Sequence, residues 1–216
     1  ASARDADEGR TVFSKAGGGN RIGERLFGED VTLYSDPLEP GLEVMPFSLS
    51  VASSSYASLF DSGLDTGRTE WVEDGVLRHL ITTRHWAARS GATATPYVGN
   101  MIFAAESGPT LEDMIASTER ALLVTCVWYI REVDPQTLLL TGLTRDGVFL
   151  VEDGKVKGAV NNFRYNMSPV HMLAQASEVG RAERTLPREF GDWFSFVKTP
   201  PLRVDDFNMS SVSQAV

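Results

Sequence analysis

Two short segments of the chain each place an Asp-Gly pair between apolar residues, and this pattern constrains the fold most. Residues 71–77 read Trp-Val-Glu-Asp-Gly-Val-Leu, and residues 150–156 read Leu-Val-Glu-Asp-Gly-Lys-Val. Asp-Gly between apolar runs is the strongest local signal for a β-hairpin, because the tight turn needs positive φ at its central residues. The two copies are too short and too distant for a solenoid repeat. We therefore predict two similar hairpins in one β-rich domain.

The rest of the chain predicts more strands than helices. Apolar or alternating runs predict strands at 30–35, 101–105, 122–129, 137–143, 148–151 and 193–197. Helices are predicted after the capping-box sequence at Thr110, over 168–180 from Ser168-Pro169 to Gly180, and over 83–89. Residues 46–69, rich in Ser, Gly and Asp, are expected to form a long loop or an irregular hairpin. Strands that cluster and helices that occur singly indicate an α+β fold, β-rich and largely antiparallel.

Composition narrows the class of protein. With 216 residues and 42% hydrophobic residues, the chain can bury a core of ordinary size. It has no apolar run of about 20 residues, so a membrane helix is not expected. Its net charge of −9 and the absence of Lys or Arg runs argue against direct binding to nucleic acid. The single cysteine excludes an internal disulfide framework and indicates a reducing, cytoplasmic location.

The three histidines do not form a recognisable metal motif. A zinc-peptidase helix needs two histidines about one turn apart, so that both ligands share a face. His79 and His85 are six residues apart, and His171 lies far away in the chain. We therefore assign no metal ligand and expect no stoichiometric zinc in this chain.

The other candidate residues also favour structural roles. Cys126 lies in an apolar run and is expected to be a small buried hydrophobe in a packed strand. Asp205-Asp206 is expected to be a solvated pair. Gly17–Gly19 matches neither the spacing of a phosphate-binding loop nor that of a dinucleotide-binding loop, which favours a flexible loop or one approached closely by backbone. The residues alone therefore identify no catalytic, cofactor-binding or metal-binding side chain.

The order of short motifs resembles the C-terminal domain of the TldD/PmbA family, a group once called modulators of DNA gyrase and now viewed as peptidase subunits. The matching stretches lie at 13–24, 30–36, 71–77, 110–122, 133–135, 147–158 and 201–207. They span nearly the whole chain. The resemblance implies that residues 1–216 are the C-terminal domain of a longer protein whose N-terminal domain is not in this chain.

The family has two kinds of subunit, and the resemblance is closer to the metal-free kind. TldD-type subunits carry an HExxxH motif before the glycine-rich region and a late cysteine in a Cys-Gly-Lys segment. Here no HExxxH occurs, and the late segment 196–201 has no cysteine. Cys126 lies instead beside bulky residues, Trp128 to Ile130, where relatives have a glycine-rich run. The resemblance therefore implies a PmbA/TldE-like subunit, with zinc expected in a TldD-type partner.

This interpretation implies a non-catalytic subunit that shapes a chamber for an extended, unfolded peptide during proteolysis or peptide maturation. Two alternatives stay open. The chain could belong to the zinc metallopeptidase subunit itself, with HExxxH upstream, or to a non-enzymatic binding protein or modulator. A metal-free subunit supports proteolysis only through a partner, so we expect a heterodimer with a TldD-type subunit or a homodimer. The aromatic residues predicted to anchor that interface are Phe47, Tyr56, Phe60, Phe190 and Trp193.

Overall fold

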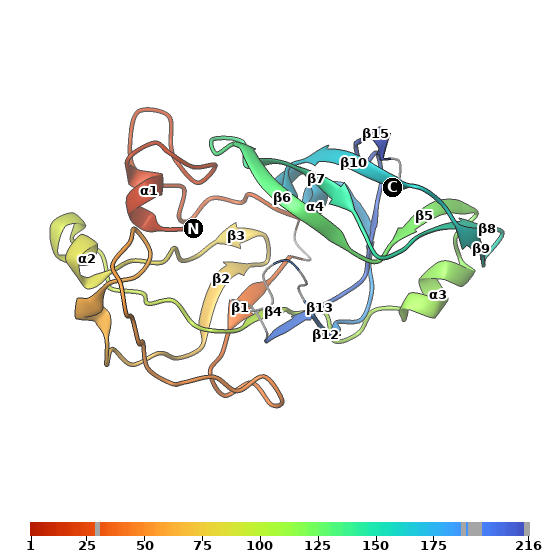
Figure 1. The fold of residues 1–216 in the computed structure, drawn as a ribbon. Coiled ribbons are helices and arrows are strands. Elements are labelled where there is room, and N and C mark those ends of the chain that lie inside the picture. Colours follow the sequence, from red (N-terminus) through yellow and green to blue (C-terminus); the bar gives the residue numbers. More distant parts are fainter. Residues whose placement is uncertain (29–30, 187–188, 190–195, 214–216) are drawn as a thin grey trace.

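In the computed structural model, which describes residues 1–28, 31–186, 189 and 196–213, short strands dominate (Figure 1). The helices of this part are α1 (Ala3–Asp7), α2 (Arg84–Ser90), α3 (Leu111–Ala116) and α4 (Pro169–Ala174), with a 3₁₀ turn at Leu59–Asp61. None of them is long and apolar enough to cross a membrane. The paired strands run antiparallel except for β13 and β4, which are parallel. The prediction of a β-rich, largely antiparallel α+β fold is confirmed.

The strands form four sheets. The largest has the order β12 (Glu183–Thr185), β13 (Val197–Thr199), β4 (Met101–Phe103), β1 (Leu33–Ser35), β2 (Thr69–Glu73) and β3 (Val76–Leu77). A second has the order β15 (Met209–Ser213), β10 (Asn162–Met167), β7 (Leu139–Thr144) and β6 (Val127–Asp134). The smaller sheets are β5 (Arg120–Val124), β8 (Val148–Glu152) and β9 (Lys155–Ala159), and the pair β11 (Ala176–Val179) and β14 (Leu202–Val204). Distant parts of the chain therefore meet in the same sheets.

Both predicted Asp-Gly hairpins are present, as β2–β3 and β8–β9. Asp74 and Gly75 have φ of 48° and 77°, and Asp153 and Gly154 have φ of 51° and 72°. Each glycine also lies against the main chain of a neighbouring segment. A Cβ added to Gly75 would lie 2.4 Å from the Phe27 carbonyl oxygen. At Gly154 it would come within 2.6 Å of the Ala116 carbonyl oxygen. The repeated motif therefore supplies both a turn and a docking point for a neighbouring segment.

The main core lies against the six-stranded sheet. Its buried side chains come from α1, β2, β3, β4 and the segments between them: Ala3, Ala6, Phe27, Val31, Val72, Leu77, Leu80 and Phe103. Val170 and Leu173 of α4, with Val179 of β11 and Leu202 of β14, pack on this cluster from the C-terminal part of the chain. A separate cluster joins Tyr34, Leu42 and Ile102. Burial of α1 explains why this short helix is stable despite having only 5 residues.

Two of the three predicted helices agree with the structure. α3 begins after Thr110, whose side chain accepts from the Asp113 N–H while the Asp113 carboxylate accepts from the Thr110 N–H. This is the predicted capping box with Asp in place of Glu. α2 begins after Thr83 and ends at Gly91, which has φ of 76°. Local capping chemistry therefore fixed both helices.

Two sequence predictions are wrong because tertiary pairing overrides local pattern. The single strand predicted at 122–129 is two strands: β5 pairs with β8, β6 pairs with β7, and the chain changes sheets at Thr125-Cys126. The helix predicted over 168–180 ends at Ala174, because residues 176–179 form β11 and pair with β14. Gly180 is therefore not its C-terminal stop. The strand predicted at 193–197 is observed from Val197, and residues 193–195 lie outside the described residues.

The two irregular regions also have defined structure. Residues 46–69 form the irregular hairpin allowed by their composition, with a bridge between Phe47 and Asp65. The glycine-rich segment is the tip of a small hairpin closed by the Ser14–Asn20 bridge and by the Lys15 N–H, which donates to the Gly19 carbonyl at 2.9 Å. Gly17 to Gly19 all have positive φ, and an added Cβ would meet nothing within 4 Å at any of them. Their glycines are required by turn conformation rather than by packing.

Candidate functional site

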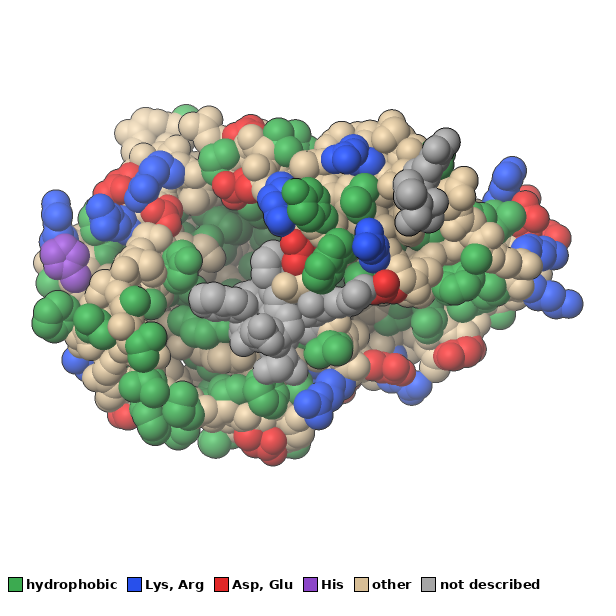
Figure 2. All heavy atoms as spheres, viewed as in Figure 1, with side chains coloured by type: hydrophobic (Ala, Val, Ile, Leu, Met, Phe, Trp, Pro, Cys, Tyr) green, Lys and Arg blue, Asp and Glu red, His purple; other side chains and the backbone are tan. Residues whose placement is uncertain are grey.

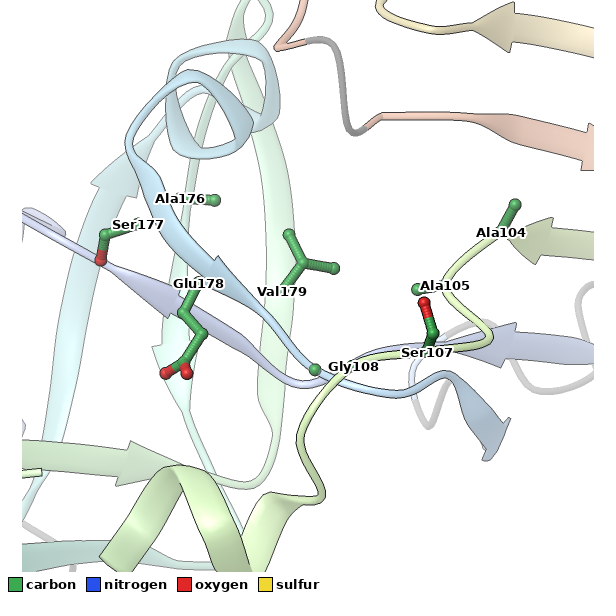
Figure 3. Close-up of a pocket in the computed structure, with 9 residues that line it drawn as sticks. Ala104, Ala105, Ser107, Gly108, Ala176, Ser177, Glu178 and Val179 are labelled. Atoms are coloured by element: carbon green, nitrogen blue, oxygen red, sulfur yellow. The ribbon is translucent and has the colours of Figure 1, made fainter. Parts of the chain in front are cut away.

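A hollow of about 310 Å³ lies between the segment that follows β4 and strand β11. Residues 104–108 form one wall, apart from Glu106, and residues 176–180 form the other. In Figure 3, the Val179 side chain points from β11 toward the opposite wall, where Ala104 and Ser107 lie. The hollow is at the lower end of the size range of small-molecule sites and holds on the order of ten water volumes.

Two glycines bring the walls together where they cross. An added Cβ on Gly108 would lie 2.3 Å from the carbonyl carbon of Gly180 and 2.6 Å from the nitrogen of Arg181. One on Gly180 would lie 2.6 Å from Pro201 Cγ. Main-chain hydrogen bonds hold the crossing: Arg181 N–H donates to Pro109 at 2.8 Å, and Ala182 N–H donates to Ala105 at 2.7 Å. No other residue type fits this approach, so the hollow depends on Gly108 and Gly180.

The walls are built mainly from small side chains. Alanine, serine and glycine make up most of the lining, and only Glu178 and Val179 are larger. The Glu178 carboxylate lies 2.8 Å from Arg203, whose guanidinium also donates to the Met114 carbonyl at 3.0 Å and to Ser117 at 2.8 Å. Arg203 therefore neutralises Glu178 and ties the β11–β14 pair to α3.

One edge of β11 is open on the side away from β14. In the part of the chain that the structure describes, β11 pairs with β14 alone, with a register shift between Ala176 and Glu178. An open strand edge binds another extended chain through main-chain N–H and C=O groups, and small side chains let that chain come close. The arrangement suits binding of an extended segment better than acid–base or nucleophilic chemistry.

A second hollow, of about 270 Å³, is lined by residues of the β6–β7 turn, β10, α4 and the β14–β15 turn. Its polar lining includes Ser168, His171 and Asp206. The Ser168 hydroxyl donates to the Thr137 carbonyl at 2.8 Å, and no hydrogen bond joins it to His171 among the described residues. Asp206 lies at an exposed turn, consistent with the solvated pair expected for Asp205-Asp206.

The structure does not bring the three histidines together. His79 follows β3 and its Nδ1 lies 2.7 Å from the Glu70 carbonyl, whereas His85 is on α2 and His171 is on α4. The described residues contain no group of three or more His, Cys, Asp or Glu side chains that could hold a metal ion.

Cys126 is not buried in a packed strand as predicted. It lies in the break between β5 and β6, is only partly buried, and its Sγ is 3.4 Å from the Val127 carbonyl. The apolar run around Cys126 predicted a packed strand. In the structure, however, Leu122 and Val127 of that run are exposed, each at 37%. The change of sheets explains the difference, since the strand turns away from a common core there.

Comparison with known proteins identifies the family. Residues 1–211 match the family described as the PmbA/TldA metallopeptidase C-terminal domain. The chain belongs to this family. The resemblance in motif order is thereby confirmed, while the metal-free subtype is not decided by this match.

Solved structures share the fold of this family member. TldE from Thermococcus kodakarensis is 20% identical, with a TM-score of 0.69 over 96% of this chain and 46% of its own. A modulator of a DNA gyrase from Thermotoga maritima is 16% identical, with a TM-score of 0.70 over 96% of this chain and 44% of its own. A similar modulator from Bacteroides thetaiotaomicron is 17% identical, with a TM-score of 0.70 over 99% and 42%. The chain thus spans less than half of each structure. No curated protein matches it.

Sequence reasoning missed the hollow because its lining carries no chemically distinctive motif. The relevant signals are Ser107-Gly108-Pro109 and Val179-Gly180, which resemble ordinary turn sequences. Only the tertiary contact between Gly108 and Gly180 shows why both positions need glycine.

Proposed function

We propose that this domain holds an extended, unfolded peptide as part of a TldD/TldE-type peptidase complex. The observation that carries the proposal is the hollow between residues 104–108 and β11, where small side chains flank a strand edge without a second neighbour in the described chain. Main-chain hydrogen bonds bind a peptide largely irrespective of its side chains, which suits a protease that accepts unfolded segments. Membership in a family named for metallopeptidases supports the same direction.

Within that complex we propose the TldE-like, metal-free role, with zinc supplied by a TldD-type partner in the cytoplasm. The likeness to TldE from Thermococcus kodakarensis supports this choice, as does the missing cysteine in residues 196–201. The zinc metallopeptidase alternative places its ligands outside this chain. Elemental analysis of the full-length protein after dialysis separates the two: about one zinc per chain would contradict the metal-free role, and less than a tenth would support it.

Peptide binding is tested directly by filling the hollow. Ala176→Leu adds bulk at the β11 wall, and Ala121→Leu makes the same change on exposed β5 as a matched control. Fluorescence anisotropy with a labelled, uncharged, unfolded peptide is expected to show at least tenfold weaker binding for Ala176→Leu and unchanged binding for the control. Equal binding by both variants would refute the assignment of the hollow. Failure of the unmodified chain to bind any such peptide would favour a non-enzymatic modulator.

A further inference from the structure

The segment 45–60, here called the uncharged loop, is an exposed apolar surface. It contains no charged residue, although 23% of the chain is charged. Large hydrophobic side chains are exposed along it: Met45, Phe47, Leu49, Val51, Tyr56, Leu59 and Phe60. Val51 is 92% exposed and Phe60 is 81% exposed. In Figure 2, hydrophobic side chains gather at the lower left, where Figure 1 draws this part of the chain in orange.

Polar groups hold the uncharged loop in place from the inside. Ser58 and Asp61 are buried, and the Asp61 carboxylate accepts from the Arg84 N–H at 2.9 Å. The Arg84 guanidinium donates to the Phe60 carbonyl at 3.1 Å, and the Leu59 N–H donates to the Ser53 hydroxyl at 3.2 Å. The loop is therefore inverted, with polar anchors inside and apolar side chains outside.

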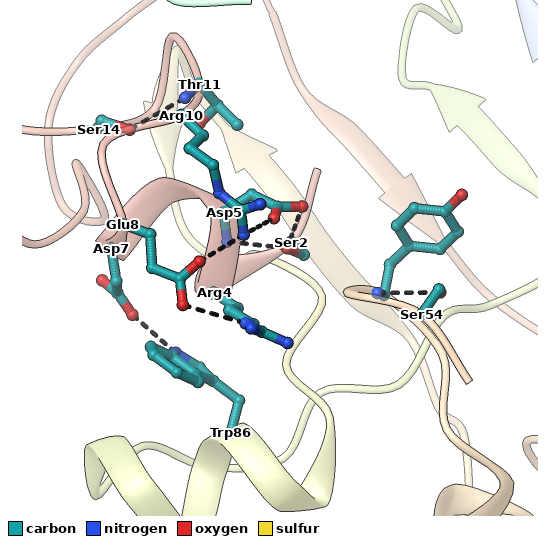
Figure 4. A network of polar contacts seen from close by, with 11 residues as sticks. Ser2, Arg4, Asp5, Asp7, Glu8, Arg10, Thr11, Ser14, Ser54 and Trp86 are labelled. Carbon is teal, nitrogen blue, oxygen red and sulfur yellow. Dashed lines mark hydrogen bonds and ion pairs between the residues drawn. The ribbon is translucent and has the colours of Figure 1, made fainter.

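The α1 region lies beside the uncharged loop. Asp5 accepts from the Ser2 hydroxyl at 2.7 Å and pairs with Arg10, within the ionic network of Figure 4. Burial alone would raise the pKa of Asp5, but hydrogen bonds from Ser55 and Ser2 and the charges of Arg10 and Arg4 outweigh it and leave the pKa lowered. Ser55 of the uncharged loop lies near enough to Asp5 to affect its pKa, so the loop runs beside this network. The exposed apolar face is held from inside by the contacts of Ser58, Asp61 and Arg84.

Around Phe47 the loop runs extended beside residues 63–66 and leaves one edge open. Ser48 N–H donates to Leu64 at 2.8 Å, and Ser48 C=O accepts from Gly63 at 2.8 Å. The Pro46 carbonyl accepts from Thr66 at 2.9 Å. Because main-chain groups alternate in direction along an extended strand, those of Phe47 and Leu49 face the opposite edge. No strand of the described chain pairs with that edge.

We propose that residues 45–51 pair antiparallel with the same residues of a second copy of this chain, about a two-fold axis. An antiparallel ribbon is complementary to itself, which is what a symmetric dimer interface requires. Two chains of net charge −9 repel each other, and this stretch lets them meet without placing like charges in contact. Phe47, Tyr56 and Phe60 are exposed by 43%, 52% and 81%, about 350 Å² if each side chain carries about 200 Å². With the four aliphatic side chains, the surface approaches the about 800 Å² per partner of a standard interface.

The pairing adds a second contact surface to the proposed peptidase complex, and the role of the dimer rests on that proposed function. It uses no residue that lines the hollow, so a TldD-type subunit would have to contact another surface. Of the five aromatic residues predicted to anchor an interface, three are exposed: Phe47, Tyr56 and Phe60. The other two, Phe190 and Trp193, lie outside the described residues.

Light scattering of the chain at 1 to about 100 µM tests the pairing. We expect a mass of twice 23.6 kDa for the unmodified chain and a dimer at least tenfold weaker for Leu49→Lys. Leu186→Lys is the matched control, because Leu186 is also an exposed leucine, at 75% against 62% for Leu49. A monomer throughout, or equal weakening by both variants, would overturn the inference.

Cross-linking tests the register independently. In a Cys126→Ser background, Ser48→Cys is expected to form an intermolecular disulfide under mild oxidation, because Ser48 lies opposite its own copy when residues 45–51 pair about a two-fold axis, and Leu186→Cys is not. A dimer in which Ser48→Cys fails to cross-link would also overturn the inference. A chain that is monomeric but still binds peptide would refute this pairing and leave the proposed function intact. A chain that dimerises but binds no peptide would refute the proposed function and leave the pairing intact.

Discussion

Gly108→Ala provides the sharpest test of how the hollow is built. Its new Cβ would lie 2.3 Å from Gly180 carbon, so the crossing would have to open by about 1 Å to reach ordinary contact at 3.4 Å. That shift would stretch the Arg181–Pro109 and Ala182–Ala105 hydrogen bonds, now 2.8 and 2.7 Å, beyond useful length. Two lost bonds at about 1 kcal/mol each, with an overpacking cost of about 1–3 kcal/mol, predict a loss of about 3–5 kcal/mol in the free energy of unfolding.

Gly158→Ala is the matched control for this substitution. Gly158 lies in exposed β9, has no positive φ, and an added Cβ there meets nothing within 4 Å. Alanine should therefore be neutral or stabilise by up to about 1 kcal/mol. Urea unfolding followed by fluorescence gives both values, and peptide anisotropy on the folded fraction should show weakened binding for Gly108→Ala alone. Free energies of unfolding that agree within about 0.5 kcal/mol for the two variants would refute the close crossing.

Three other substitutions test the core, a buried phenol and the cysteine. Asn100 is 1% exposed and donates to the Asp36 and Leu42 carbonyls at 2.6 and 2.8 Å, so Asn100→Asp should cost about 2–4 kcal/mol at pH 8. Part of that loss should return below about pH 5, where the new buried carboxyl is protonated; a pH-independent loss in urea titrations would contradict this. Burial, followed by the negative charges of Glu189 and Cys126, raises the pKa of Tyr165 to about 12. The folded state then keeps a proton that the unfolded state loses above about pH 10, so the free energy of unfolding should fall by up to about 1.4 kcal/mol per pH unit between pH 10 and 12. Because burial also raises the pKa values of Tyr34 and Tyr97, Tyr165→Phe should reduce that slope in urea titrations rather than abolish it, and an unchanged slope would reject the assignment. Cys126 is only partly buried, so Cys126→Ala should cost less than about 1 kcal/mol and leave peptide binding unchanged; lost binding at an unchanged melting temperature would give the thiol a functional role.

Local chemistry determined several features directly from the sequence. Asp74-Gly75 and Asp153-Gly154 predict hairpins because few residue pairs tolerate positive φ, and Thr110 with Asp113 predicts a helix start because their side chains satisfy free N–H groups. These signals depend on neighbours in the chain and survive in any fold. The order of the motifs was likewise sufficient to indicate the family, which the match over residues 1–211 confirms.

Only the tertiary structure decided where strands end, which surface is apolar and where a ligand could bind. Residues 122–129 form one apolar run in sequence but enter two sheets, and residues 176–179 leave a helical pattern to pair with β14. The hollow depends on contact between Gly108 and Gly180, which are 72 residues apart. The uncharged loop turns its apolar side chains outward while Arg84, from a distant helix, binds the Phe60 carbonyl from inside. Sequence periodicity reports which side chains could be buried together, whereas the partners that bury or expose them are set by contacts between distant segments.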